Sequence, residues 1–126
     1  MKPAAAWKAL KKHASAKDGA WEDHPWGETV YKVGKKIFVF LGSAEHGYGL
    51  SCKLPDSHEA AITMFSFAEP TAYGLGKSGW VSARFERNQD VPLDLLKAWI
   101  DESHAAVAPK RKPRAPSSRA AGRTRR

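Results

Sequence analysis

The residues most suggestive of chemistry are Gly76, Lys77 and Ser78, because a Gly-Lys-Ser run also ends the phosphate-binding loop of many nucleotide hydrolases. In such a loop, backbone amides surround a phosphate and the lysine reaches it. The complete motif requires a glycine five positions before Gly76, where this chain has Thr71. It also requires a helix directly afterwards, whereas residues 79–85 alternate in polarity as a strand does. The sequence therefore argues against nucleotide hydrolysis.

The loop around Lys77 is compatible with two interpretations. Its glycines, Gly74, Gly76 and Gly79, permit positive φ or a close backbone approach. The loop is either a flexible connection with a solvated lysine or a polar contact loop beside Trp80. Spacing alone leaves both open.

The remaining reactive side chains show no catalytic pattern. The five histidines lack the spacing of metal ligands, and they are His13, His24, His46, His58 and His104. No pair of nucleophile and base is apparent. The single cysteine, Cys52, falls on the apolar side of an alternating segment, so we interpret it as a buried hydrophobic residue and not as a nucleophile. We expect a protein that is not an enzyme and that needs no metal or cofactor.

The positive charge is concentrated at the C-terminal end of the chain. Of the 21 lysines and arginines, eight lie in residues 109–126, which leaves 13 of them to balance all 13 acidic residues in residues 1–108. The eight are Lys110, Arg111, Lys112, Arg114, Arg119, Arg123, Arg125 and Arg126. Proline, serine, alanine and arginine dominate this segment and cannot bury enough apolar surface to order it. We expect one neutral domain over residues 1–108, followed by a disordered basic tail over residues 109–126.

Length and composition also bear on the compartment. A chain of 126 residues fits a single domain. One cysteine permits no internal disulfide, as expected in a reducing cytoplasm. The N-terminal residues contain no long apolar run, so neither a signal peptide nor a membrane span is indicated. We expect a soluble, cytoplasmic monomer.

The first half of the chain is predicted to form a helix, a loop and a hairpin. Helical spacing of apolar residues predicts a helix over residues 3–17. Residues 21–27 are expected to form a compact loop. Residues 29–34 and 36–41 have the pattern of two strands joined by a tight turn. The second of these strands is apolar on both faces, so it should lie centrally in the sheet.

The second half completes an α+β pattern. Strands are predicted over residues 48–54, 67–73 and 79–85. A short helix with a capping-box spacing is predicted over residues 56–65, and a strongly amphipathic helix over residues 92–107. We therefore predict an antiparallel sheet of about five strands with helices packed on one face.

The opposite face of this sheet is expected to be small, polar and open to solvent. Its predicted residues are Gly49, Ser51, Lys53, Trp80, Ser82 and Arg84. Two cations and a tryptophan on a shallow surface suggest a place where a ligand could bind.

Four short motifs occur in the order found in one known family. They are Pro-Trp-Gly at residues 25–27, Val-Tyr-Lys-Val-Gly-Lys-Lys-Ile-Phe at 30–38, Leu-Ser-Cys-Lys at 50–53 and Leu-Gly-Lys-Ser-Gly-Trp at 75–80. With these motifs the chain resembles the MmcQ/YjbR family from the first helix to about residue 109.

The resemblance implies a CyaY-like fold, in which an antiparallel sheet is backed by helices, and DNA binding through a double-wing arrangement. Gly76 and Gly79 stand where many members have Asn and His, and Tyr73 where many have His. The roles of those polar side chains are therefore not carried over, whereas those of Lys77 and Trp80 are.

Taken together, these features predict a small protein that binds nucleic acid, namely DNA, with low sequence specificity. The tail would neutralise phosphates, and Lys53, Lys77 and Arg84 would add contacts from the domain. Trp80 would stack on an unpaired base. The sequence shows no recognition helix with base-reading side chains. The alternative is a module that binds a protein or a small ligand, with the tail as a non-specific anchor.

Overall fold

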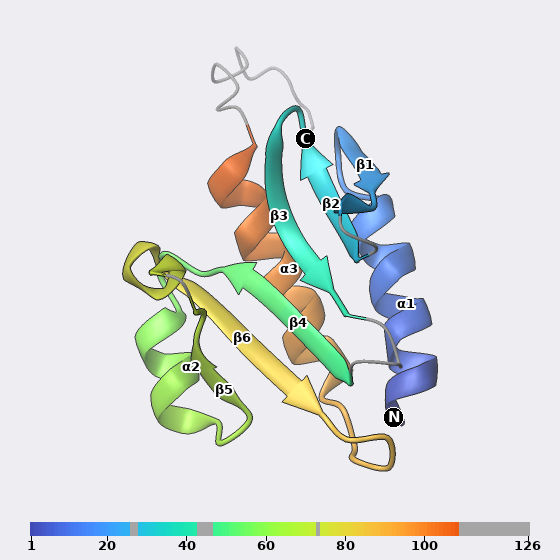
Figure 1. The fold of residues 1–126 in the computed structure, drawn as a ribbon, viewed down its shortest axis with the longest axis vertical. Coiled ribbons are helices and arrows are strands. Elements are labelled where there is room, and N and C mark those ends of the chain that lie inside the picture. Colours follow the sequence, from blue (N-terminus) through green and yellow to red (C-terminus); the bar gives the residue numbers. More distant parts are fainter. Residues whose placement is uncertain (26–27, 43–46, 73, 109–126) are drawn as a thin grey trace, which may run out of the picture.

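The computed structural model describes residues 1–25, 28–42, 47–72 and 74–108, and the predicted tail lies outside them. In chain order the elements are α1 (Pro3–Ser15), β1 (Ala20–Asp23), β2 (Thr29–Val33), β3 (Lys36–Leu41), β4 (Tyr48–Lys53), α2 (His58–Met64), β5 (Ala68–Pro70), the 3-10 helix η3 (Leu75–Ser78), β6 (Trp80–Phe85) and α3 (Leu93–Val107). Figure 1 shows the sheet in front of α1 and α3. The predicted α+β class is confirmed.

The sheet has the strand order β1-β2-β3-β4-β6-β5, and every neighbouring pair is antiparallel. The strand β3 lies inside the sheet, as its two apolar faces predict. Six strands are found where about five are expected, because β1 occupies part of the predicted loop over residues 21–27. The sequence of β1 does not show the alternation of a strand, because it carries acidic side chains that bond to β2. Glu22 accepts a hydrogen bond from the Tyr31 hydroxyl at 2.6 Å, and Asp23 accepts one from Lys32 at 2.7 Å.

The helices α1 and α3 cover one face of the sheet. The core that they close contains Trp7 and Leu10 of α1 and Trp99 and Ile100 of α3, all buried. The ring of Trp99 lies 6.4 Å from that of Phe65 and 6.2 Å from that of Phe67, centroid to centroid. The closing role predicted for the last helix is therefore confirmed.

The cysteine lies in this core. Cys52 on β4 is fully buried, and its side chain shares a face with Val39 and Val81, its partners on the neighbouring strands. Burial raises the pKa of the Cys52 thiol, with a smaller contribution from the nearby Glu102 carboxylate. The predicted role as a buried hydrophobic residue is confirmed.

The start of α2 differs from the predicted capping box. Ser57 is the residue before the helix, but its side chain makes no capping hydrogen bond. Its hydroxyl instead donates to Glu102 Oε1 of α3 at 2.6 Å. The other carboxylate oxygen of Glu102 accepts the backbone amides of Asp56 at 3.0 Å and Ser57 at 3.1 Å. A carboxylate from a distant helix therefore binds two backbone amides directly before α2, where the sequence predicts a local capping box.

Candidate functional site

The face of the sheet opposite α1 and α3, which we call the outer face, has the composition that the sequence predicts. Cross-strand register pairs Lys53 with Trp80, Ser51 with Ser82, and Gly49 with Arg84 between β4 and β6. Directly paired residues point to the same side of a sheet. Five predicted side chains therefore share this face: those of Lys53 and Ser51 on β4 and those of Trp80, Ser82 and Arg84 on β6.

The middle of the outer face is a row of hydroxyl groups. The Ser51 and Ser82 hydroxyl oxygens lie 2.7 Å apart, and those of Thr71 and Ser82 lie 2.9 Å apart. Each of these three hydroxyl groups thus has a hydrogen-bond partner within the protein.

The prediction of an exposed ring at Trp80 is wrong. Only 9% of this residue is exposed, and its ring meets the Phe40 ring of β3 edge-on, with centroids 5.8 Å apart. Alternation in β6 correctly predicts the side to which Trp80 points, but the neighbouring strands decide how much of it is covered. The outer face therefore has an apolar cluster of its own, at the end where β6 begins.

A groove of about 370 Å³ lies at one end of the outer face, where β3 and β4 diverge. These strands pair only through residues 39–41 and 50–52, and Figure 1 shows the end of α3 behind the gap between them. The lining residues are Lys35, Lys36, Ile37, Phe40, Lys53, Leu75, Trp80, Ala106 and Val107. Three are cationic, six are apolar, and no acidic residue is among them.

Ser103 of α3 holds the diverging strands in place. Its hydroxyl oxygen accepts the backbone N–H of Lys53 at 2.8 Å, and its O–H donates to the backbone carbonyl of Phe38. Ser103 is fully buried, so both backbone groups would otherwise lack a partner in the core. In the sequence, Ser103 is a polar residue at helical spacing between Trp99 and Val107, but its role as a bridge between β3 and β4 was not predicted.

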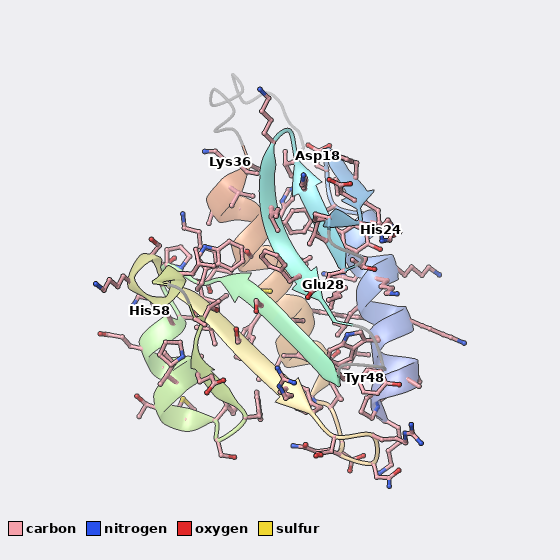
Figure 2. All side chains as sticks on the ribbon, viewed as in Figure 1. Asp18, His24, Glu28, Lys36, Tyr48 and His58 are labelled. Atoms are coloured by element: carbon pink, nitrogen blue, oxygen red, sulfur yellow. The ribbon has the colours of Figure 1, made fainter. Side chains whose placement is uncertain are left out.

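The groove lysines come from two separate segments. Lys35 lies in the turn between β2 and β3, after the left-handed Gly34, whose φ is +60°, and Lys36 is the first residue of β3. Both lysines are exposed. Figure 2 labels Lys36 at the end of the sheet where α3 also ends. Lys53 is half-buried at the end of β4. Lys35 and Lys36 were not predicted as site residues, because lysines beside a hairpin turn are ordinarily just exposed to solvent.

Two other predicted contact residues lie away from the groove. Lys77 is exposed on η3 and is not among the lining residues. Arg84 is four residues along β6 from Trp80, about 13 Å at about 3.3 Å per residue, and its guanidinium lies beside Gly47. The structure therefore brings together Lys53 and Trp80 but not Lys77 or Arg84, and the predicted contacts at residues 110–126 lie outside the described residues.

The loop around Lys77 is a closed turn. Gly74 and Gly79 have φ of +81° and +89°, and η3 lies between them. The amides of Gly76, Lys77 and Gly79 donate to backbone carbonyls at residues 71, 74 and 76, at 3.0, 3.2 and 3.0 Å. Because these three amides are already bound, they cannot serve as the outward donors that a phosphate-binding loop needs.

A second polar cluster lies on the edge strand β1. Glu22 there accepts the Tyr31 hydroxyl, and its other oxygen lies 2.7 Å from His24 Nε2. The hydrogen bond from Tyr31 lowers the pKa of Glu22 against the opposing effect of burial, and the His24 contact lowers it further. Within the described ranges, no group of three histidine, cysteine or acidic side chains is placed to hold a metal ion. We therefore interpret this cluster as a structural link between β1 and β2.

Comparison with known proteins identifies the family. Residues 15–106 match the model of the YjbR family. No curated protein matches the chain. In the part of the chain that the structure describes, no helix is long and apolar enough to cross a membrane. The match extends from the end of α1 almost to the end of α3 and includes the sheet and nearly all of the groove. Because it covers well over half of the sequence, the chain belongs to the YjbR family.

Proposed function

We propose that this protein binds nucleic acid, namely DNA, without catalysing a reaction, and that it uses the basic C-terminal segment together with the groove end of the outer face. One observation carries the proposal: the last residue of α3, Val107, lines the groove with Lys35, Lys36 and Lys53. Ala108, the last residue that the structure describes, directly follows Val107, and the eight basic residues come after it in the sequence. A polyanion bound at the groove lysines could therefore also meet the basic segment.

The binding mechanism is electrostatic. Each lysine or arginine that neutralises a phosphate releases counterions, so affinity falls as salt rises. Low sequence specificity is expected because contacts to phosphates carry no sequence information directly. Lys77 and Arg84 would be outlying phosphate contacts.

The test is a salt titration of the full chain by fluorescence anisotropy, with duplex DNA, single-stranded DNA and RNA as probes. The matched variant replaces all eight basic residues of 109–126 with glutamine and keeps the chain length. We expect this variant to bind weakly and with a much smaller salt dependence. Equal binding by the two proteins would contradict the role of the tail.

Single substitutions then test the domain. Lys53→Ala, Lys77→Ala and Arg84→Ala should each lower the salt slope on duplex DNA by about 0.9 if the residue meets one phosphate. Trp80→Ala is expected to lower the melting temperature, because Trp80 is buried against Phe40, so it is not used to test a base contact. If the three charge changes have no effect and a peptide of residues 109–126 binds as well as the full chain, the domain makes no contact.

The second candidate is a small-ligand or protein-binding module. The groove favours it, since about 370 Å³ falls within the roughly 300–1,000 Å³ typical of ligand sites. This function would be supported if the full chain failed to bind all three nucleic acids at low salt.

A further inference from the structure

The groove has a feature that phosphate binding alone does not explain. Its apolar lining residues, which we call the floor, include Ile37, Phe40, Leu75 and Trp80. A surface that only contacts phosphates needs cations and amides, and an apolar floor adds nothing to it. The occupant should therefore have both a negative charge and an apolar face.

We infer that the groove holds one unpaired base of a single-stranded nucleic acid, with the base on the apolar floor and the flanking phosphates on Lys35, Lys36 and Lys53. This inference rests on the proposed function and adds to it a preference for single strands over duplexes.

The charge of the lining argues against two other occupants, the basic C-terminal segment and a purely apolar partner. The segment 109–126 carries eight positive charges and is repelled by three lysines in a groove without acids. A purely apolar partner would remove water from Lys53 and its neighbours without offering them a counter-charge, which is costly. A nucleotide avoids both problems, because its base is flat and its phosphates lie at the margin.

Size and shape favour an unpaired base. A volume of about 370 Å³ is at the small end of ligand sites, and a duplex keeps its base faces inside the stack. The edge-on contact between Phe40 and Trp80 and the Ser103 bridge between β3 and β4 hold the floor before the ligand arrives. A preformed floor lowers the ordering cost of binding.

The experiment compares three probes of equal length with the full chain: a single-stranded DNA, the same strand without bases, and a duplex. The strand without bases has the same phosphates, so it isolates the contribution of the floor. We expect the intact strand to bind at least about fivefold more tightly than the strand without bases, since one stacked base contributes about 1 kcal/mol or more.

Two sets of variants assign that preference to the groove. Ile37→Ser and Leu75→Ser should bring the ratio between the intact strand and the strand without bases close to one, with little change in salt slope. Replacing Lys35, Lys36 and Lys53 with alanine should lower the slope on single strands by up to about 2. The control replaces Lys8, Lys11 and Lys12, three exposed lysines of α1, and should keep both the ratio and most of the slope.

Three results would overturn the inference. They are equal affinity of the unsubstituted chain for the intact strand and the strand without bases, an unchanged ratio in both floor variants, and equal losses in the two lysine variants. In each case nucleic-acid binding itself would stand. A chain that binds none of the three probes would overturn the proposed function instead.

Discussion

The two faces of the sheet are made by the same strands and differ in what covers them. On the helix side, Cys52, Val81 and Phe85 are sealed beneath α1 and α3. On the outer face, the hydroxyl groups of Ser51 and Ser82 pair with each other, and the groove contains only cations and apolar groups. We expect the helix side to carry the stability of the fold and, under the proposed function, the outer face to carry binding. Substitutions on the two faces should therefore affect different measurements.

The faces meet at Ser103. This side chain belongs to the helix that seals the core, yet it bonds to Lys53, whose side chain lines the groove. Changes there should affect both faces, unlike changes elsewhere.

The largest effect is expected at Trp99. Trp99→Ala removes an aromatic ring that is 4% exposed, and it should lower the free energy of unfolding by about 3–5 kcal/mol in urea denaturation. Trp21 is the matched control, because it lies on the opposite side of the sheet and is 46% exposed. Trp21→Ala should cost much less, and equal costs would break the proposed division between the faces.

The next largest effect is expected at Ser103. Ser103→Ala leaves the Lys53 amide and the Phe38 carbonyl without their partner and should cost about 1–3 kcal/mol of unfolding free energy. It should also weaken binding of single strands, because the floor of the groove loses its support. Ser15→Ala removes an exposed hydroxyl that bonds Lys12 and should change stability by less than about 0.5 kcal/mol. A Ser103 variant with unchanged stability would show that the bridge is unimportant.

A smaller effect concerns pH and is confined to the helix side. Asp101 accepts Lys17 at 2.9 Å and His13 at 2.7 Å. Burial alone would raise the pKa of Asp101, but the hydrogen bonds from Lys17 and His13 outweigh it, and the net pKa is lowered. The folded protein thus binds this proton less readily than the unfolded chain does. The stabilisation is present above the unfolded pKa of about 3.9 and is lost as pH falls through the folded value.

Asp101→Asn should therefore flatten the fall in melting temperature below about pH 4, as followed by circular dichroism. The effect should be under about 1 kcal/mol, because the pair is partly exposed and screened by solvent. Lys53→Ala should leave the melting temperature below about pH 4 as it is in the unsubstituted chain, since it removes no carboxylate and leaves the contacts of Asp101 with Lys17 and His13 in place. If the melting temperature fell with pH equally in the Asp101 variant and the unsubstituted chain, the contacts of Asp101 with Lys17 and His13 would contribute nothing to stability in acid.

The smallest effect on stability is expected from the tail. The apolar pattern of α3 ends at Val107, so removal of residues 109–126 should leave the melting temperature within about 1 °C while abolishing most nucleic-acid binding. A large drop in melting temperature would mean that the segment supports the folded core.

Much of the fold could be predicted from local patterns. The β2–β3 hairpin, the central place of β3 and the side to which each residue of β6 points all follow from a two-residue period. The closing role of α3 follows from its apolar stripe. The strand β1 could not be predicted in this way, because Glu22 and Asp23 are satisfied by Tyr31 and Lys32 of β2, a pairing that no single segment reveals.

The candidate site was predicted only in part, and the missing part is tertiary. The sequence by itself determined that Lys53 and Trp80 share a face, because the alternation of side chains is a property of each strand's own backbone. Only the tertiary structure decided that β3 and β4 diverge, since Ser103 bridges to Phe38 from 65 residues away. The same packing covers Trp80 with Phe40 and brings Lys35 and Lys36 beside Lys53. Such contacts depend on how distant elements pack against each other, so no periodic pattern in the sequence predicts them.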